Sequence, residues 1–220
     1  VCEKELYSPL NPAWSTQCSA LAETLEPLDG KFVVEIASND GTLLKECDQR
    51  GALTIGIEPA RNFLTSGVPT ICDFWSAEVA SRPMLRGTVD VLIACNVLGH
   101  VDNVHDFVEG IKIALAPDGI AVIEVPHIVE LLRHNAFDTI YHEHLSYWGI
   151  QPLMRLLSEH GLILQDAQPL EVHGGSLRFT VGHTGPIGQR VWSVFKYENY
   201  ENEERMREQQ AAFAQRCRAL

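Results

Sequence analysis

The stretch VVEIASNDG, residues 33–41, decides the fold class of this chain. An apolar run that ends in an acidic residue and is followed by small turn residues is typical of a β-strand that leads through a tight turn into a helix. Such a turn lets the backbone approach a nucleoside closely. The stretch lacks the G-x-G-x-x-G pattern of dinucleotide-binding turns, so we do not expect a pyrophosphate cradle.

Acidic residues close to this turn indicate the charge of a ligand. Glu35 and Asp40 would repel phosphates and favour a cationic molecule, such as the sulfonium and amino groups of S-adenosylmethionine. Glu58 ends the next expected strand, about 20 residues after the turn, where an acidic residue hydrogen-bonds ribose hydroxyls in Rossmann-type sheets. The alternatives are an ordinary strand, turn and helix for the first feature and a surface carboxylate for Glu58.

Strands that alternate with helical patterns surround this stretch and predict an α/β fold with a doubly wound, mostly parallel sheet. The strands are apolar throughout, as expected where helices cover both faces of a sheet. We expect strands over 31–36, 53–57, 69–72, 89–95 and 120–125, helices over 42–50 and 104–115, and a turn at 117–119.

The two ends of the chain follow different patterns. Residues 13–28 indicate an amphipathic lead-in helix, so we assign 1–29 to a lead-in and 30–183 to the ligand-binding domain. Late in that domain, two strands joined by a Gly-Gly turn predict an antiparallel pair. Residues 184–220 are expected to form a long exposed C-terminal helix that leads into a further module. The late elements are helices over 127–134 and 150–160 and strands over 163–170 and 176–182.

Composition limits the possible partners and location. The 220 residues carry a net charge of −12 with a pI near 5.1, which argues against nucleic acid or an anionic membrane as a partner. The six cysteines show no C-x-x-C pair, so free thiols and a cytoplasmic location are expected. No apolar run reaches the ~18 residues of a membrane helix, and no signal peptide is apparent. We expect a monomer, and a fragment at both ends because residue 1 is Val rather than Met and the chain ends in a charged helical pattern.

A row of titratable side chains, Tyr141, His142, Glu143 and His144, closes the stretch FDTIYHEH, residues 137–144. Such a cluster has no evident packing role and could supply a general base, an acid and a partner for an oxyanion at one place. A zinc site is the alternative, but H-E-x-x-H spacing is absent and adjacent residues of an extended segment point to opposite sides. We therefore predict no metal.

Two further groups of residues could face a ligand. Asn96 and His100 follow the strand expected at 89–95, and ligands of open α/β sheets bind beyond the carboxyl ends of strands. His100 could instead only cap a loop. In the stretch HGGS, residues 173–176, backbone amides could hold an anion with Arg178 nearby, although an ordinary hairpin turn is equally consistent with it.

The motifs EIASNDGTLL, GIEPAxN, NVLGHV, FVEGIK, LAPDG, EVPH, FDTIYHEH and HGGSLR closely resemble those of the sugar C-methyltransferases of antibiotic biosynthesis. Members of that family use S-adenosylmethionine to methylate C3 of a TDP-linked 4-keto-deoxysugar. The resemblance covers residues 30–182 and implies a class I methyltransferase fold. It implies that His144 is the catalytic base and that Tyr141, Glu143 and His100 surround the sugar.

The resemblance also implies binding residues. The cofactor positions are Glu35, Ala37, Ser38, Asn39, Asp40, Gly41, Glu58, Pro59, Asp73, Phe74 and Asn96, and the further substrate positions are His142, His173, Gly174, Ser176 and Arg178.

The chain departs from the family at several points. The family's N-terminal zinc-binding module with paired cysteines and its C-terminal Rossmann-like module are absent from this sequence. Ala37 stands where many members have Gly, and the chain is several residues short between Asn62 and Gly67. The alternatives are therefore an O- or N-methyltransferase for a small molecule, a noncatalytic cofactor-binding remnant, and a nicotinamide-dependent reductase, which the missing glycine pattern disfavours.

Overall fold

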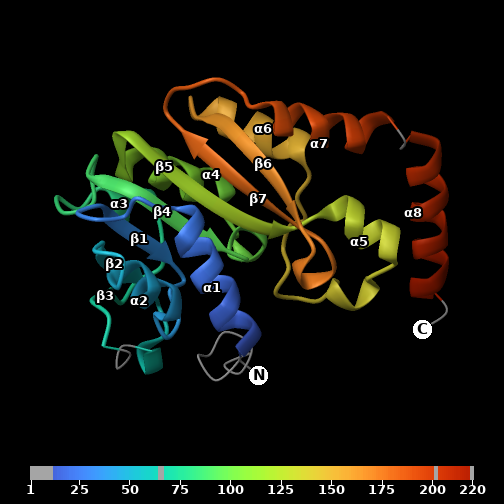
Figure 1. Cartoon of the computed structure of the whole chain (residues 1–220). Coiled ribbons are helices and arrows are strands. Elements are labelled where there is room, and N and C mark those ends of the chain that lie inside the picture. Colours follow the sequence, from blue (N-terminus) through green and yellow to red (C-terminus); the bar gives the residue numbers. More distant parts are fainter. Residues whose placement is uncertain (1–11, 64–66, 201–202, 219–220) are drawn as a thin grey trace. The chain divides into compact units, whose positions relative to one another are not determined.

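The computed structural model describes residues 12–63, 67–200 and 203–218 (Figure 1). The first elements along the chain alternate between helix and strand. They are α1 (Pro12–Thr24), β1 (Phe32–Ile36), α2 (Thr42–Asp48), β2 (Leu53–Ile57), the 3₁₀ turn η1 (Arg61–Phe63), β3 (Thr70–Ile71), α3 (Ala77–Ala80), β4 (Val89–Cys95), η2 (Leu98–His100) and α4 (Val104–Ala114).

The later elements contain the antiparallel strands and the C-terminal helices. They are β5 (Leu115–Pro126), α5 (Ile128–His134), η3 (Phe137–Thr139), α6 (Ile150–Glu159), β6 (Ile163–Leu170), η4 (Val172–Gly174), β7 (Ser176–Gly182), α7 (Gln189–Tyr200) and α8 (Glu203–Arg218).

The seven strands are hydrogen-bonded in the order β3-β2-β1-β4-β5-β7-β6. β1 pairs in parallel with β2 and β4, and β2 pairs in parallel with β3. β6 and β7 are antiparallel. The predicted mostly parallel sheet with a late antiparallel pair is therefore confirmed, and the continuous apolar runs agree with it because Val33, Val34 and Leu92 are fully buried.

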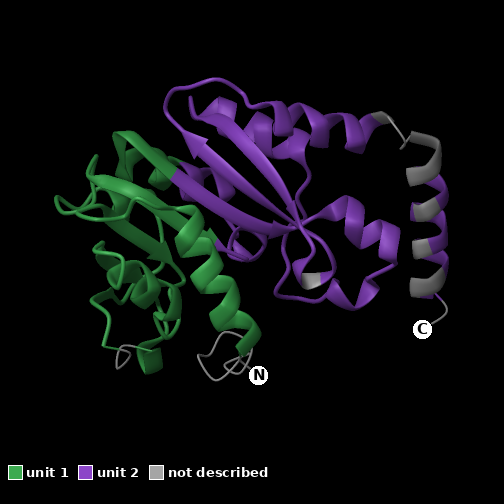
Figure 2. Cartoon of the chain, viewed as in Figure 1, with its two compact units in different colours: residues 1–94, 109–120 green, residues 95–108, 121–220 purple. Residues whose placement is uncertain are grey.

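The chain divides into two compact units, residues 1–94 with 109–120 and residues 95–108 with 121–220 (Figure 2). In the first unit α1 packs against α2, and α2 packs against β1 and β2. Helix α1 buries Trp14, Cys18 and Leu21 on one face, as expected of an amphipathic helix, but it ends at Thr24 rather than at residue 28. Pro27 explains the earlier end, because proline lacks an N–H donor and disfavours helical geometry in the residue before it.

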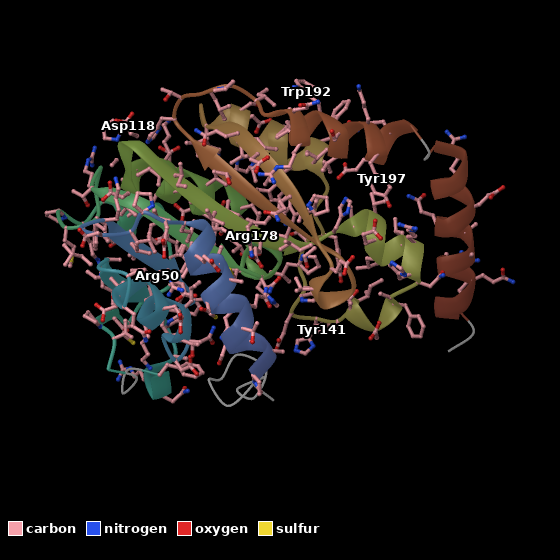
Figure 3. All side chains as sticks on the ribbon, viewed as in Figure 1. Arg50, Asp118, Tyr141, Arg178, Trp192 and Tyr197 are labelled. Atoms are coloured by element: carbon pink, nitrogen blue, oxygen red, sulfur yellow. The ribbon has the colours of Figure 1, made fainter. Side chains whose placement is uncertain are left out.

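The predicted turn at 117–119 is wrong, because these residues belong to the strand β5. Asp118 lies near its beginning (Figure 3). Pro117 and Asp118 are exposed, and Gly119 is buried. A Cβ at Gly119 would lie 2.4 Å from the carbonyl oxygen of Val89. The glycine therefore allows close approach to β4, which a Pro-Asp-Gly signal does not distinguish from a turn.

The prediction of one long exposed C-terminal helix is also wrong. The segment forms α7 and α8, and α7 packs against β6 with Val191 and Val194 buried. Near the end of α7, both carboxylate oxygens of Glu198 accept from the backbone N–H of Ile150, at 2.8 and 3.0 Å. The Gly149 N-cap of α6 has no side chain to cap the helix, so Glu198 supplies this cap from another element.

In the same place Glu198 Oε1 lies 2.8 Å from Nε2 of His127, and both side chains are buried. This contact fixes α7 to the junction of β5 and α5. Within the described ranges, no helix combines the length and the apolar character needed to cross a bilayer.

Candidate active site

The turn between β1 and α2 has an unusual backbone. Ala37 and Asn39 have φ values of 56° and 49°, in the left-handed region that is unfavourable for residues with a Cβ. The amide of Ala37 donates to the carbonyl oxygen of Ile57 at 2.8 Å, and Asn39 Nδ2 donates to the carbonyl oxygen of Ala37 at 2.8 Å. Ala37 thus occupies a position where glycine is sterically favoured, which agrees with the family's preference there.

Both oxygens of the buried Glu58 carboxylate hold this turn and the chain after β2. Oε2 accepts from the amide of Asn39 at 3.1 Å, and Oε1 accepts from the amide of Ala60 at 2.8 Å. Only 4% of Glu58 is exposed, so the alternative of a surface carboxylate is wrong. Each carboxylate oxygen keeps further acceptor capacity, which suits a ligand that carries two hydroxyls.

Glu35, at the end of β1, is the second buried carboxylate of this unit. Its register partner on β2 is Gly56, where a Cβ would lie 2.2 Å from Ser38 Oγ, so the glycine lets the turn fold over the neighbouring strand. Glu35 Oε2 is buried without a hydrogen-bond partner among the described residues. Burial, followed by the charges of Asp40 and Glu58, raises the pKa of Glu35 well above 4.5.

Other predicted cofactor residues of this unit lie around the turn and after β3. Asp40 Oδ1 accepts from the amide and hydroxyl of Thr42 and so caps α2, which follows Gly41. Asp73 accepts from Arg82 at 2.5 Å and from the amide of Phe74 at 2.9 Å. Phe74 is exposed, and the carbonyl oxygen of Pro59 accepts from the Cys72 thiol at 3.6 Å.

In the second unit, two hydrogen bonds favour one tautomer of the His144 ring. Its Nδ1 lies 2.7 Å from the carbonyl oxygen of Thr139, and its Nε2 lies 3.2 Å from the hydroxyl of Tyr141. A carbonyl oxygen only accepts, so Nδ1 of the neutral ring carries the proton and Nε2 is the basic nitrogen. The geometry of His144 is therefore that of a general base.

His100 belongs to the same cluster. Its ring centroid lies 4.8 Å from that of His144, and its Nδ1 lies 2.8 Å from the carbonyl oxygen of Glu143. The backbone amides of Leu145 and Ser146 donate to the carbonyl oxygen of Gly99, at 2.8 and 3.1 Å. These bonds join the chain after β4 to the segment after η3, so His100, Tyr141 and His144 lie together in this unit.

The two intervening residues point elsewhere. The carboxylate of Glu143 lies 3.8 Å from Nε2 of His142, and both side chains are largely exposed. Glu143 does not orient His144 through its side chain, because the Thr139 carbonyl oxygen bonds Nδ1 of His144. Backbone carbonyls carry no sequence signal, which is why this partner could not be anticipated.

Asn96 follows β4 in the second unit with a φ of 55°. Its amide N–H donates to the carbonyl oxygen of Glu124 at 2.9 Å. The side-chain atoms Nδ2 and Oδ1 are buried and have no hydrogen-bond partner within the described part of the chain. Native structures rarely leave such a group unsatisfied, so Asn96 is suited to receive a ligand that both donates and accepts.

At residues 173–176, the predicted anion site, the Gly175 amide is already used within the turn. The amide of Gly175 donates to the carbonyl oxygen of Val172 at 2.9 Å, and Ser176 Oγ donates to the same oxygen at 3.2 Å. Gly174 and Ser176 line a cavity of about 720 Å³ together with Glu130. The side chain of His173 lies outside the described residues.

Arg178, the predicted cation of this anion site, is directed at a buried carboxylate. Its Nε donates to Oε1 of Glu124 at 2.6 Å, and a second guanidinium nitrogen lies 2.6 Å from the same oxygen. Glu124 is 1% exposed and the Arg178 side chain 12%. Sequence reasoning missed this pair because the Glu124 side chain lies within an otherwise apolar strand.

A family model described as "Methyltransferase domain" matches residues 13–166. The chain belongs to this family. This methyltransferase domain is also 40% identical over 154 residues to the C-methyltransferase NovU of Streptomyces niveus, in a match that covers 68% of the chain and 37% of the relative. The chain thus spans little more than a third of the length of that curated relative.

Solved structures confirm the class I methyltransferase fold. A chain of the complex between the Haloferax volcanii Trm112 methyltransferase activator and the putative methyltransferase aligns with a TM-score of 0.63 at 12% identity, over 83% of this chain and 98% of that chain. The magnesium protoporphyrin IX methyltransferase of Synechocystis with bound SAH aligns with a TM-score of 0.61 at 13% identity, over 82% and 92%. Identities this low support the fold alone.

Family membership confirms S-adenosylmethionine as the cofactor of this methyltransferase domain. The residues of the first unit fit it. The unpartnered buried oxygen of Glu35 suits a cationic cofactor, and Glu58, which the backbone holds in place, suits the ribose hydroxyls. Among the described residues, no group of three His, Cys, Asp or Glu side chains could hold a metal ion.

Replacing Glu58 with Gln should weaken cofactor binding by about 1–3 kcal/mol, the scale of hydrogen bonds to a charged group. The amide nitrogen of Gln would also face one of the two backbone N–H groups that Glu58 accepts from. Titration calorimetry with S-adenosylhomocysteine measures the effect. Glu78→Gln, an exposed carboxylate on α3, is the matched control. Equal affinities of the two variants for S-adenosylhomocysteine would show that Glu58 does not contact the cofactor.

Glu35 should make the unliganded domain less stable as the pH rises. Its pKa in the folded chain lies well above the value of 4.5, so the folded state binds the additional proton between these two pKa values. The stabilising contribution is complete below pH 4.5 and is lost as the pH rises through the raised pKa. Urea unfolding of the wild type and Glu35→Gln at several pH values tests this. The variant should gain stability relative to the wild type as the pH rises, and a constant difference would contradict the assignment.

Proposed function

We propose that this chain is the cofactor-binding and proton-abstracting part of a C-methyltransferase for a nucleotide-linked keto-deoxysugar. Two findings support this. The chain is 40% identical to a protein named as a C-methyltransferase, and its Tyr141–His144 segment presents a basic imidazole nitrogen. A C–H bond beside a ketone is weakly acidic, so carbon methylation needs a positioned base and stabilisation of the enolate.

The observation that carries the proposal is the pair of hydrogen bonds at His144. Because Nδ1–H donates to the Thr139 carbonyl oxygen, Nε2 is the ring nitrogen that carries the lone pair. In the neutral state the Tyr141 hydroxyl is the donor to Nε2. Nε2 has one lone pair, so the Tyr141 O–H must turn away from His144 before Nε2 can take up the substrate proton.

This rotation of the Tyr141 O–H suits enolate formation. The redirected Tyr141 O–H would donate to the enolate oxygen while negative charge develops there. His100 would contact the sugar from the neighbouring position in the cluster. Glu35 and Glu58 would hold the cofactor, which supplies an electrophilic methyl group when it is bound.

Product analysis tests the proposal. The full-length protein is incubated with a TDP-4-keto-deoxysugar and ¹³C-methyl-labelled S-adenosylmethionine. We expect a methyl signal coupled to a sugar carbon in the NMR spectrum of the product. A methyl group on oxygen or nitrogen would identify the alternative class of methyltransferase. No incorporation, together with normal cofactor binding, would identify a noncatalytic cofactor-binding protein.

We further propose a monomer that acts on small molecules in a reducing cytoplasm. The net charge of −12 supports the exclusion of nucleic acid and anionic membranes. Among the described residues, Cys18, Cys47, Cys72 and Cys95 form no disulfide, and burial raises the pKa of Cys47 to about 12. Light scattering after gel filtration tests the monomer.

A further inference from the structure

The Thr139 carbonyl oxygen that bonds His144 has a second donor. The hydroxyl of Tyr147 donates to it at 3.2 Å, while His144 Nδ1 lies 2.7 Å away. The rings of His144 and Tyr147 meet edge to face, with centroids 6.0 Å apart and planes at 88°. One backbone oxygen therefore joins a phenol and an imidazole that are three residues apart.

We propose that Tyr147 is a positioning residue, which fixes the Thr139 carbonyl group and thereby the tautomer and orientation of His144. A carbonyl oxygen has two acceptor lone pairs, and here each receives one donor. With both occupied, the peptide plane after Thr139 has a single preferred orientation, and that orientation aims the second lone pair at Nδ1 of His144. The catalytic role of Tyr147 rests on the proposed function, whereas its control of the His144 tautomer does not depend on that function.

The segment needs such a tether because it lacks regular structure. Between η3 and α6 the chain forms turns and irregular backbone, and Ile140, Glu143 and Leu145 are exposed. Within η3 itself, Thr139 Oγ1 donates to the carbonyl oxygen of Ala136 at 2.7 Å, which holds the residue but leaves its carbonyl group to be set by other donors.

Tyr147 can supply the tether because the next residue, Trp148, is held by burial and by hydrogen bonds. Trp148 is buried, and its carbonyl oxygen accepts from the amide of Ile128 at the start of α5 at 3.0 Å. The Trp148 indole N–H donates to Ser146 Oγ at 2.9 Å. Burial raises the pKa of the Tyr147 phenol, so this group remains a donor over the range in which an imidazole titrates.

Imidazole ¹⁵N NMR spectra of the chain test the proposal without any substrate. In the wild type, the neutral form of His144 should show a protonated Nδ1. Tyr147→Phe should raise the population of the minor Nε2–H tautomer about 2–10-fold, the scale of one neutral hydrogen bond. Tyr197→Phe is the matched control, since it removes a hydroxyl that donates to Glu130 at 2.5 Å on another part of the second unit.

Kinetics of the full-length protein provide the second measurement. Tyr147→Phe should lower kcat about 2–10-fold with KM unchanged, because the base is misaligned while the sugar contacts remain. A protonated Nε2 in the wild type, or a Tyr147→Phe spectrum identical to that of the wild type, would overturn the proposal. If the wild type shows no C-methylation, the proposed function fails, and the NMR result alone still decides the role of Tyr147.

Discussion

Replacing His144 with Ala should slow proton removal from the substrate carbon by about 10²–10⁴-fold, the contribution of a positioned general base. The step is measured as exchange of solvent deuterium into the α-carbon of the keto sugar, by the full-length protein, without a methyl donor. Exchange reports the base directly because it needs no methyl transfer. The effect should be this large because Nε2 of His144 is the basic nitrogen of a ring fixed at both ends.

Two controls separate this role from general damage. S-adenosylhomocysteine should bind His144→Ala with nearly wild-type affinity, since the proposed cofactor contacts come from Glu35 and Glu58. His142→Ala should exchange at close to the wild-type rate, because the His142 side chain is 89% exposed and pairs only loosely with Glu143. Wild-type exchange in His144→Ala would transfer the base role to His100 or Tyr141.

Replacing Arg178 with Met should lower the free energy of unfolding by roughly 3 kcal/mol, because it breaks a buried ion pair. Met keeps much of the side-chain volume but leaves the Glu124 carboxylate, 1% exposed, without the guanidinium beside it. Urea denaturation of the isolated chain gives the free energy of unfolding. Arg178→Lys should recover part of the loss, since a single ammonium cannot reproduce the two-nitrogen contact.

An exposed ion pair of the same second unit is the matched control. Arg190 on α7 pairs with Asp166 on β6, and its side chain is 60% exposed. Arg190→Met should cost no more than about 1 kcal/mol, as is usual for surface pairs. If Arg178→Met instead folds normally and loses affinity for an anionic sugar nucleotide, the sequence-based assignment of Arg178 to the substrate is correct and the structural role is secondary.

The strands could be predicted from the sequence because their signal is local. Local strand-forming patterns place β2, β4, β6 and β7 at the residues where the structure has them. The failures involve contacts between distant parts of the chain. Gly119 belongs to a strand because Val89 lies against it, and α7 is partly buried because Glu198 reaches His127 and Ile150.

In the candidate site, too, the local sequence indicates some residues but not their distant partners. Side chains that must be acidic, basic or phenolic for the chemistry, such as Glu58, Tyr141 and His144, could be selected by type and position. Their partners could not, because the atoms that fix them belong to the main chain. Glu58 bonds two amides, and His144 and His100 each bond a carbonyl oxygen. The sequence suggests a ligand as the partner of Arg178, because nothing near Arg178 in the sequence indicates that Glu124 pairs with it.

Dependence on main-chain oxygens has an evolutionary consequence for the two histidines. Every amino acid supplies a carbonyl group, so mutation at Thr139 or Glu143 can alter the side chain while the acceptor for each imidazole persists. Natural variation at these positions should therefore be constrained by backbone shape rather than by chemical type. Related chains can then diverge in the side chains around the two imidazoles while they keep the same protonation pattern at both rings.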